Sequence, residues 1–157
     1  MIKLILCCAL CTSTLLASLE LQRGKERLAA TAEEMSEIIG RMISMLRFES
    51  ADVFAICHEV FDDKYPDFRD ISAGDFPTLW KSACETLIAD SETVRIFKII
   101  GETLGASDAQ SQIEHLSNLR NDLHEHAKEL KHKATETKKL YTTLGALSGL
   151  AAAIMII

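Results

Sequence analysis

The residues that decide the fold run from Ser107 to Lys139 and read SDAQSQIEHLSNLRNDLHEHAKELKHKATETKK. Apolar or small side chains recur in this stretch every three or four residues, charged side chains fill the other faces, and only Arg120 interrupts the stripe. The stripe continues a little beyond the stretch and consists of Ile113, Leu116, Leu123, Ala127, Leu130, Ala134, Thr137, Tyr141 and Leu144. A narrow stripe with this spacing is typical of a coiled-coil seam, so it predicts one long helix that pairs with another.

The residues that precede this helix predict a turn. Gly105 is of the type that commonly ends a helix in a left-handed conformation, and Ser107 with Gln110 has the spacing of a capping box. Asp108 would place a negative charge at the helix N-terminus, which the helix dipole favours, and Gln112 is free to bond back across the turn. We interpret these residues as a structural turn; the alternative is a docking site.

A second stripe with the same spacing lies near the start of the chain. It consists of Leu21, Leu28, Ala32, Met35, Ile39, Met42 and Leu46. At ~1.5 Å per residue, helices over 20–48 and 107–139 would span about 43 Å and about 50 Å. Because the two lengths nearly match, we predict that these helices form a long antiparallel coiled-coil stalk.

Residues 50–105 predict shorter helices that close the far end of this stalk as a small bundle. Pro66 would end the first of them, and Pro77 suits the first turn of the next. No segment alternates apolar and polar residues over the length of a strand. We therefore expect an all-α domain over 20–139.

Both ends of the chain are almost free of charge, with Lys3 alone in 1–19 and none in 140–157. A membrane-spanning helix needs about 20 apolar residues, with a range of roughly 17 to 25, so each end predicts a transmembrane helix continuous with the stalk. The first end has an alternative as a cleaved signal peptide. Gly145 and Gly149 form a G-x-x-x-G pattern that lets two helices approach closely, and we predict a packing face there for membrane partners or a second copy. The alternative is that glycine is simply common in membrane helices.

The basic residues predict how the chain is oriented. Arg23, Lys25 and Arg27 follow the first apolar end, and a lysine cluster over 128–139 precedes the second. Positively charged flanks stay in the cytoplasm, so the 20–139 domain is expected to face the cytoplasm. The lysine cluster would also lie near anionic lipid headgroups.

The sequence shows no catalytic, cofactor or metal motif. The formal net charge of −6 argues against a nucleic-acid partner, which requires a basic face. Cys57 and Cys84 lie on apolar helix faces, where buried structural thiols are the common case. The acidic residues Asp62, Asp63 and Asp67 lack the spacing of a calcium loop, and we predict for them a docking surface for a basic partner; the alternative is a solvated surface.

Two motifs resemble the stage III sporulation protein AB family. The first reads FxxxGxxLGxxDxxxQ over residues 97–112, and the second reads KLYxxLGxLxGL over residues 139–150. The order of apolar end, charged domain and apolar end agrees with the family as well. Residues 50–90 match it only in their helical pattern.

This resemblance implies a component of the secretion-like apparatus that assembles in the mother-cell membrane around the developing forespore. The soluble part of the family is similar to the inner-membrane platform domains of type II secretion and type IV pilus systems. As implied partners, the chain would have other stage III membrane subunits and a cytoplasmic ATPase-like subunit, and it would have no enzymatic activity itself. The alternative function is a membrane-tethered signalling module that transmits movement through the coiled-coil stalk.

Overall fold

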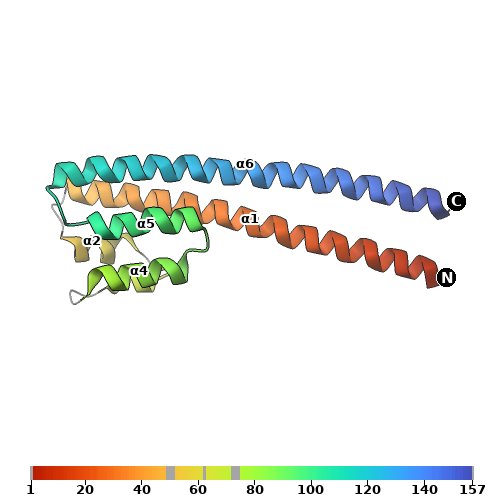
Figure 1. The fold of residues 1–157 in the computed structure, drawn as a ribbon, viewed down its shortest axis with the longest axis horizontal. Helices are drawn as coiled ribbons and strands as arrows, with labels where there is room; N and C mark the ends of the chain where they lie inside the picture. The colour runs from red at the N-terminus through yellow and green to blue at the C-terminus, as the bar shows by residue number, and fades with distance from the viewer. Residues whose placement is uncertain (1, 49–51, 62, 72–74, 157) are drawn as a thin grey trace. The chain divides into compact units, whose positions relative to one another are not determined.

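The computed structural model describes residues 2–48, 52–61, 63–71 and 75–156, and every regular element in these ranges is a helix (Figure 1). Side chains are described from Glu20 to Leu144 within these ranges, except those of residues 21, 87 and 142, and for Leu147. The helices are α1 (Ile2–Phe48), α2 (Val53–Val60), α3 (Pro66–Arg69), α4 (Phe76–Leu87), α5 (Ser91–Thr103) and α6 (Ala109–Ile156). The predicted all-α class is confirmed.

The chain divides into two compact units. The terminal unit comprises Met1–Ala29 and Lys128–Ile157, and the central unit comprises Ala30–Ala127. Both long helices, α1 and α6, contribute a segment to each unit. The predicted boundaries after residues 19 and 139 rest on polarity, and this division by contacts does not test them.

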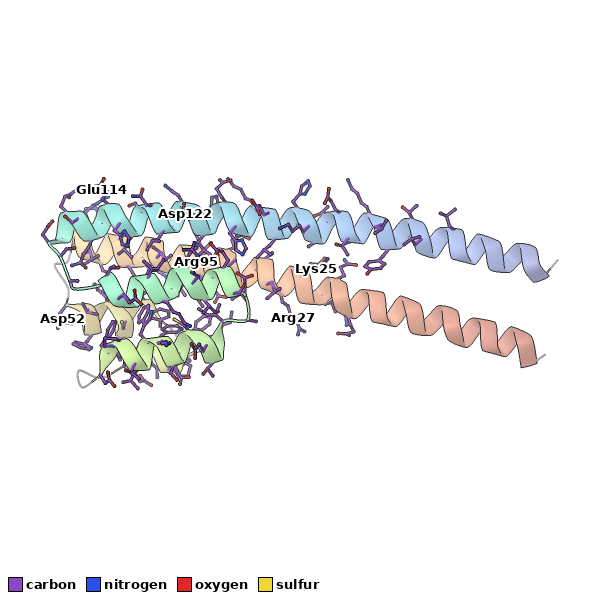
Figure 2. All side chains as sticks on the ribbon, viewed as in Figure 1. Lys25, Arg27, Asp52, Arg95, Glu114 and Asp122 are labelled. Atoms are coloured by element: carbon purple, nitrogen blue, oxygen red, sulfur yellow. The ribbon has the colours of Figure 1, made fainter. Side chains whose placement is uncertain are left out.

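In the terminal unit, the segments of α1 and α6 run antiparallel (Figure 1). Lys25 Nζ on α1 donates a hydrogen bond of 2.9 Å to Thr137 Oγ1 on α6 (Figure 2). Ala29 and Ala134 are both buried, as expected where small side chains let two helices approach. The pairing agrees with the predicted stripes, but a coiled-coil stalk as such is not confirmed.

The ends of the two long helices carry the predicted membrane segments. Among the described residues, no helix combines the length and apolar character that crossing a bilayer requires. The predicted transmembrane helices over 1–19 and 140–157 are therefore not confirmed, and most of their side chains lie outside the described residues. The leucines of this region whose side chains are described, Leu140, Leu144 and Leu147, are exposed.

In the central unit, the apolar stripes of α1 and α6 face each other. Ser36 Oγ donates to the backbone carbonyl of Arg120 at 3.4 Å, which places the two helices side by side. The buried apolar side chains are Ala32, Met35, Ile38, Ile39, Met42, Ile43 and Met45 on α1, and Ile113, Leu116, Leu119, Leu123 and Ala127 on α6. Leu119 is absent from the predicted stripe. Leu119 lies three residues after Leu116 and four before Leu123, so it continues the apolar stripe at the place where the exposed Arg120 interrupts the predicted one.

The four shorter helices meet in a layer of aromatic rings. The rings of Phe61 and Phe68 stack with their centroids 4.7 Å apart, and those of Trp80 and Phe97 stack at 6.2 Å. Phe68 also meets Trp80 edge to face at 4.9 Å. These residues come from the end of α2, from α3, from α4 and from α5 in turn, so one aromatic cluster holds together helices that are too short to be stable alone.

Candidate functional site

The turn between α5 and α6 has a left-handed glycine that a single side chain braces. Gly105 has a φ of 82°, a conformation that glycine adopts without steric cost. A Cβ atom at this position would also come within 2.9 Å of Val53 Cγ2. Gln112 Oε1 accepts a hydrogen bond from the Gly105 N–H at 3.1 Å, and Gln112 Nε2 donates to the Ser107 carbonyl. The carboxamide of Gln112 thus spans the turn in both directions.

Asp108, and not Ser107, caps the start of α6. Its Oδ1 accepts from the Ser111 N–H at 2.9 Å, and its Oδ2 accepts from the Ser111 hydroxyl at 2.7 Å. These bonds from Ser111 hold the pKa of Asp108 below its usual value. The predicted capping box of Ser107 and Gln110 is therefore wrong, because the helix begins at Ala109 and a cap has to lie directly before it.

Gly101, which belongs to the first family-like motif, makes room for an indole. A Cβ atom at Gly101 would lie only 2.2 Å from Trp80 Cδ1. The Trp80 Nε1–H donates to the Phe97 carbonyl at 2.6 Å, so the indole is held in place on the face of α5. The spacing of four residues between Phe97 and Gly101 is thus explained by one side chain of α4.

A largely buried polar contact between the cap of α5 and α6 has no counterpart in the sequence analysis. Asp90 Oδ2 accepts from the Thr93 N–H at 2.8 Å and from the Thr93 hydroxyl at 2.7 Å, so it caps α5. The same oxygen lies 2.8 Å from His126 Nε2 of α6, and both side chains are largely buried. The D-x-x-T spacing, which is a helix-start signal, could have revealed the cap, but no local signal indicates His126.

The Asp90 contact predicts a stability effect that depends on pH. Burial acts to raise the pKa of Asp90, but the hydrogen bonds from Thr93 and His126 outweigh it, so the pKa lies below its ordinary value. A carboxyl group whose pKa is lowered by folding stabilises the protein above its unfolded pKa of about 4, and this contribution is lost as the pH falls through the folded pKa. We expect Asp90→Ala to lower the free energy of unfolding by about 1.5 kcal/mol at pH 7.

Urea denaturation of both proteins at several pH values measures this effect. The difference between wild type and Asp90→Ala is expected to shrink below about pH 4. Glu102→Gln, which changes an exposed carboxylate of the same helix, is the control and is expected to have little effect at any pH. If the difference in the free energy of unfolding between wild type and Asp90→Ala stays constant down to pH 2, the negative charge of the Asp90 carboxylate does not contribute to stability.

The predicted acidic surface also includes one arginine and an apolar area. Asp62 lies outside the described residues. Asp63 is exposed and forms an ion pair with Arg69, which also bonds Asp70 at 3.0 Å. Asp67 is exposed, and together with Asp70 it lines a hollow of about 400 Å³ whose apolar wall includes Leu79. The surface is therefore a mixed acidic and apolar one.

None of the remaining residues that the sequence analysis singled out forms a site among the described residues. Gly145 and Gly149 lie in α6, but their surroundings fall outside the described residues. Cys57 and Cys84 are buried, and burial raises the pKa of each thiol to about 12, so neither is a thiolate at neutral pH. In the described part of the chain, no three His, Cys, Asp or Glu side chains gather into a possible metal site.

The chain matches a known protein family over most of its length. The family model of stage III sporulation protein AB matches residues 3–157, which is nearly the whole chain. No curated protein and no solved structure shows significant similarity to the chain.

Proposed function

The chain belongs to the stage III sporulation protein AB family, and on this premise we propose that it is a non-enzymatic component of the membrane apparatus of that stage. The observation that carries the proposal is the extent of the family match, which includes both apolar ends as well as the helical domain. A role in stage III of sporulation follows from the family itself. The more specific role as a scaffold for a secretion-type complex is our proposal.

In this proposal, residues 1–19 and 140–157 anchor the chain in the mother-cell membrane around the forespore. The basic residues beside these ends support a cytoplasmic position for the domain between them, since positive flanks are retained there. Gly145 and Gly149 would pack against other stage III membrane subunits or a second copy, because small residues let membrane helices approach closely.

The surface of Asp63, Asp67 and Asp70 would contact a cytoplasmic ATPase-like subunit through basic side chains. Asp67 and Asp70 border the apolar wall formed by Leu79, and Leu79 is 43% exposed. An acidic rim beside exposed apolar area suits a basic amphipathic segment, because charge steers the encounter while apolar contact contributes the affinity.

Deletion of the gene in the organism that encodes the chain tests the proposed role. We expect sporulation to stop after engulfment, with small or collapsing forespores visible by microscopy, and we expect the wild-type gene to restore spores. Normal spore formation in the deletion strain would refute the proposal.

Charge reversal tests the docking surface. We expect the double variant Asp63→Lys with Asp67→Lys to lose co-purification with the ATPase-like subunit, because attraction becomes repulsion at two exposed positions. The control is Glu114→Lys with Asp122→Lys, which makes the same change of charge on α6 (Figure 2). Equal co-purification of both variants with wild type would remove this surface from the proposal.

A further inference from the structure

Basic side chains gather in the terminal unit, whereas the central unit is strongly acidic. Residues 20–29 and 128–139 contain eight lysines and arginines against four glutamates. The central unit, Ala30–Ala127, contains eight lysines and arginines against nineteen aspartates and glutamates. The formal net charge of −6 therefore combines two regions of opposite sign. We call the lysines and arginines of 20–29 and 128–139 the basic belt.

The pairing of α1 and α6 brings the two parts of the basic belt to the same level. Lys25 Nζ on α1 donates to Thr137 Oγ1 on α6 at 2.9 Å, although the two residues are 112 positions apart in the chain. Arg27 lies on the other side of α1 from Lys25 (Figure 2), since two residues turn a helix by about 200°. On α6, Lys133 and Lys139 are about 120° apart around the axis. The belt therefore extends around the pair of helices.

The chain itself does little to neutralise this charge. Arg27 and Lys139 are exposed, and neither forms an ion pair with a described residue. Lys25 bonds an uncharged hydroxyl. Lys133 lies 3.6 Å from Glu129, but their side chains are 63% and 68% exposed, and exposed ion pairs contribute little stability. These side chains can therefore turn toward an external anion at small cost.

An exposed apolar surface begins where the basic belt ends. Leu140 follows Lys139 directly, and Leu140, Leu144 and Leu147 are 60%, 51% and 60% exposed. Their spacing of four and three residues places them along one side of α6, and we call them the leucine row. Tyr141, which is half-buried, lies at the same boundary, as aromatic side chains do at membrane surfaces. The outer surface of α6 thus changes from positive to apolar within one residue.

This boundary decides which anion suits the belt. A nucleic acid, or the acidic central unit of a second copy, would neutralise the positive charge but leave the leucine row in water. A bilayer of anionic lipids meets both requirements, because its acyl chains cover leucines while its headgroups accept from lysine and arginine. Long basic side chains reach such headgroups from the edge of the apolar region.

We propose that the basic belt binds the headgroups of anionic phospholipids, with the leucine row in the adjoining acyl region. The inference rests on the proposed anchoring of residues 1–19 and 140–157 in a membrane. It adds the class of lipid that this anchor prefers.

Spin-labelled lipids test this preference on the full chain. The protein is reconstituted in phosphatidylcholine bilayers with a trace of spin-labelled phosphatidylglycerol or spin-labelled phosphatidylcholine, and electron paramagnetic resonance measures how much of each label the protein immobilises. We expect phosphatidylglycerol to associate about fivefold more strongly, which is the ratio that one basic side chain beside an anionic surface provides. In 1 M salt the Debye length falls to about 3 Å, so the two lipids are expected to associate almost equally.

Two double variants locate the effect. Arg27→Gln with Lys139→Gln is expected to lower the preference to about twofold or less, because both side chains are exposed members of the belt. The control is Arg41→Gln with Lys81→Gln, which removes the same charge at exposed positions of the central unit. This control is expected to keep the full preference.

The outcomes separate this inference from the membrane anchor. Immobilisation of both lipids to the same extent would overturn the inference and leave the anchor intact, and self-association that 1 M salt abolishes would then assign the belt to the acidic unit of a second copy. A preference that persists in 1 M salt or in Arg27→Gln with Lys139→Gln would also overturn it. Immobilisation of phosphatidylglycerol alone would support the inference and contradict the anchor, whereas immobilisation of neither lipid would refute both.

Discussion

Phe68→Ala is expected to lower the free energy of unfolding by about 4 kcal/mol. Phe68 is 0% exposed and lies at the centre of the aromatic layer. Its ring is 4.7 Å from Phe61, 4.9 Å from Trp80 and 6.0 Å from Phe97, measured between centroids. Removing the ring leaves a cavity that three fixed neighbours cannot fill. It also releases α3, which has four residues and cannot persist without packing.

Urea denaturation followed by far-UV circular dichroism measures this loss. Phe48→Ala is the matched control, because Phe48 is 78% exposed and its truncation is expected to change stability by less than about 0.5 kcal/mol. If Phe68→Ala and Phe48→Ala had similar midpoints, the aromatic layer would not be the core of the central unit.

Gly101→Ala is expected to destabilise the protein by about 2 kcal/mol or more. Alanine is the better helix former by about 1 kcal/mol, but the new methyl group would overlap the indole of Trp80. The three nearest atoms, Cδ1, Cγ and Nε1, lie 2.2, 2.6 and 2.7 Å from the Cβ position. The indole cannot retreat easily, because it stacks on Phe97 and donates to the Phe97 carbonyl. Overpacking of this kind costs about 1–3 kcal/mol and occasionally more.

Thermal unfolding and tryptophan fluorescence report on Gly101→Ala together. For a chain of this size, a loss of 2 kcal/mol lowers Tm by about 4–8 °C. Because Trp80 is the single tryptophan, a shift in the emission of the folded protein would show that its indole has moved. A Tm at or above that of wild type would show that α5 and α4 can separate without cost.

Two further variants isolate the cause of this effect. At Gly24, a Cβ atom would have no neighbour within 4 Å, so Gly24→Ala is expected to stabilise the protein by up to about 1 kcal/mol. In a Trp80→Phe background, Gly101→Ala is expected to cost less than in wild type, because a smaller ring leaves room for the methyl group. An equal cost in both backgrounds would mean that the indole is not the obstacle.

The apolar spacing of the sequence predicted much of the fold because that information is local. Recurrence every three or four residues shows which side of a helix is apolar, and this was sufficient for the all-α class and the opposed stripes of α1 and α6. The left-handed conformation of Gly105 could be predicted for the same reason, because the need for glycine in such a turn depends on backbone sterics alone. The helix cap at Asp90 could also have been predicted from its D-x-x-T spacing, but the sequence analysis does not include it.

The contacts that could not be predicted join residues that are distant in sequence. Periodicity does not say which side chain lies opposite another, because the register between packed helices depends on the shapes of all the side chains between them. Hence Gly101 could be recognised as part of a motif, but the reason for a glycine there could not. That reason is the close approach of the Trp80 indole, which occurs only in the folded protein. The same is true of His126, which meets Asp90. The sequence by itself determined which faces of the helices are buried, and the tertiary structure decided which residues meet there.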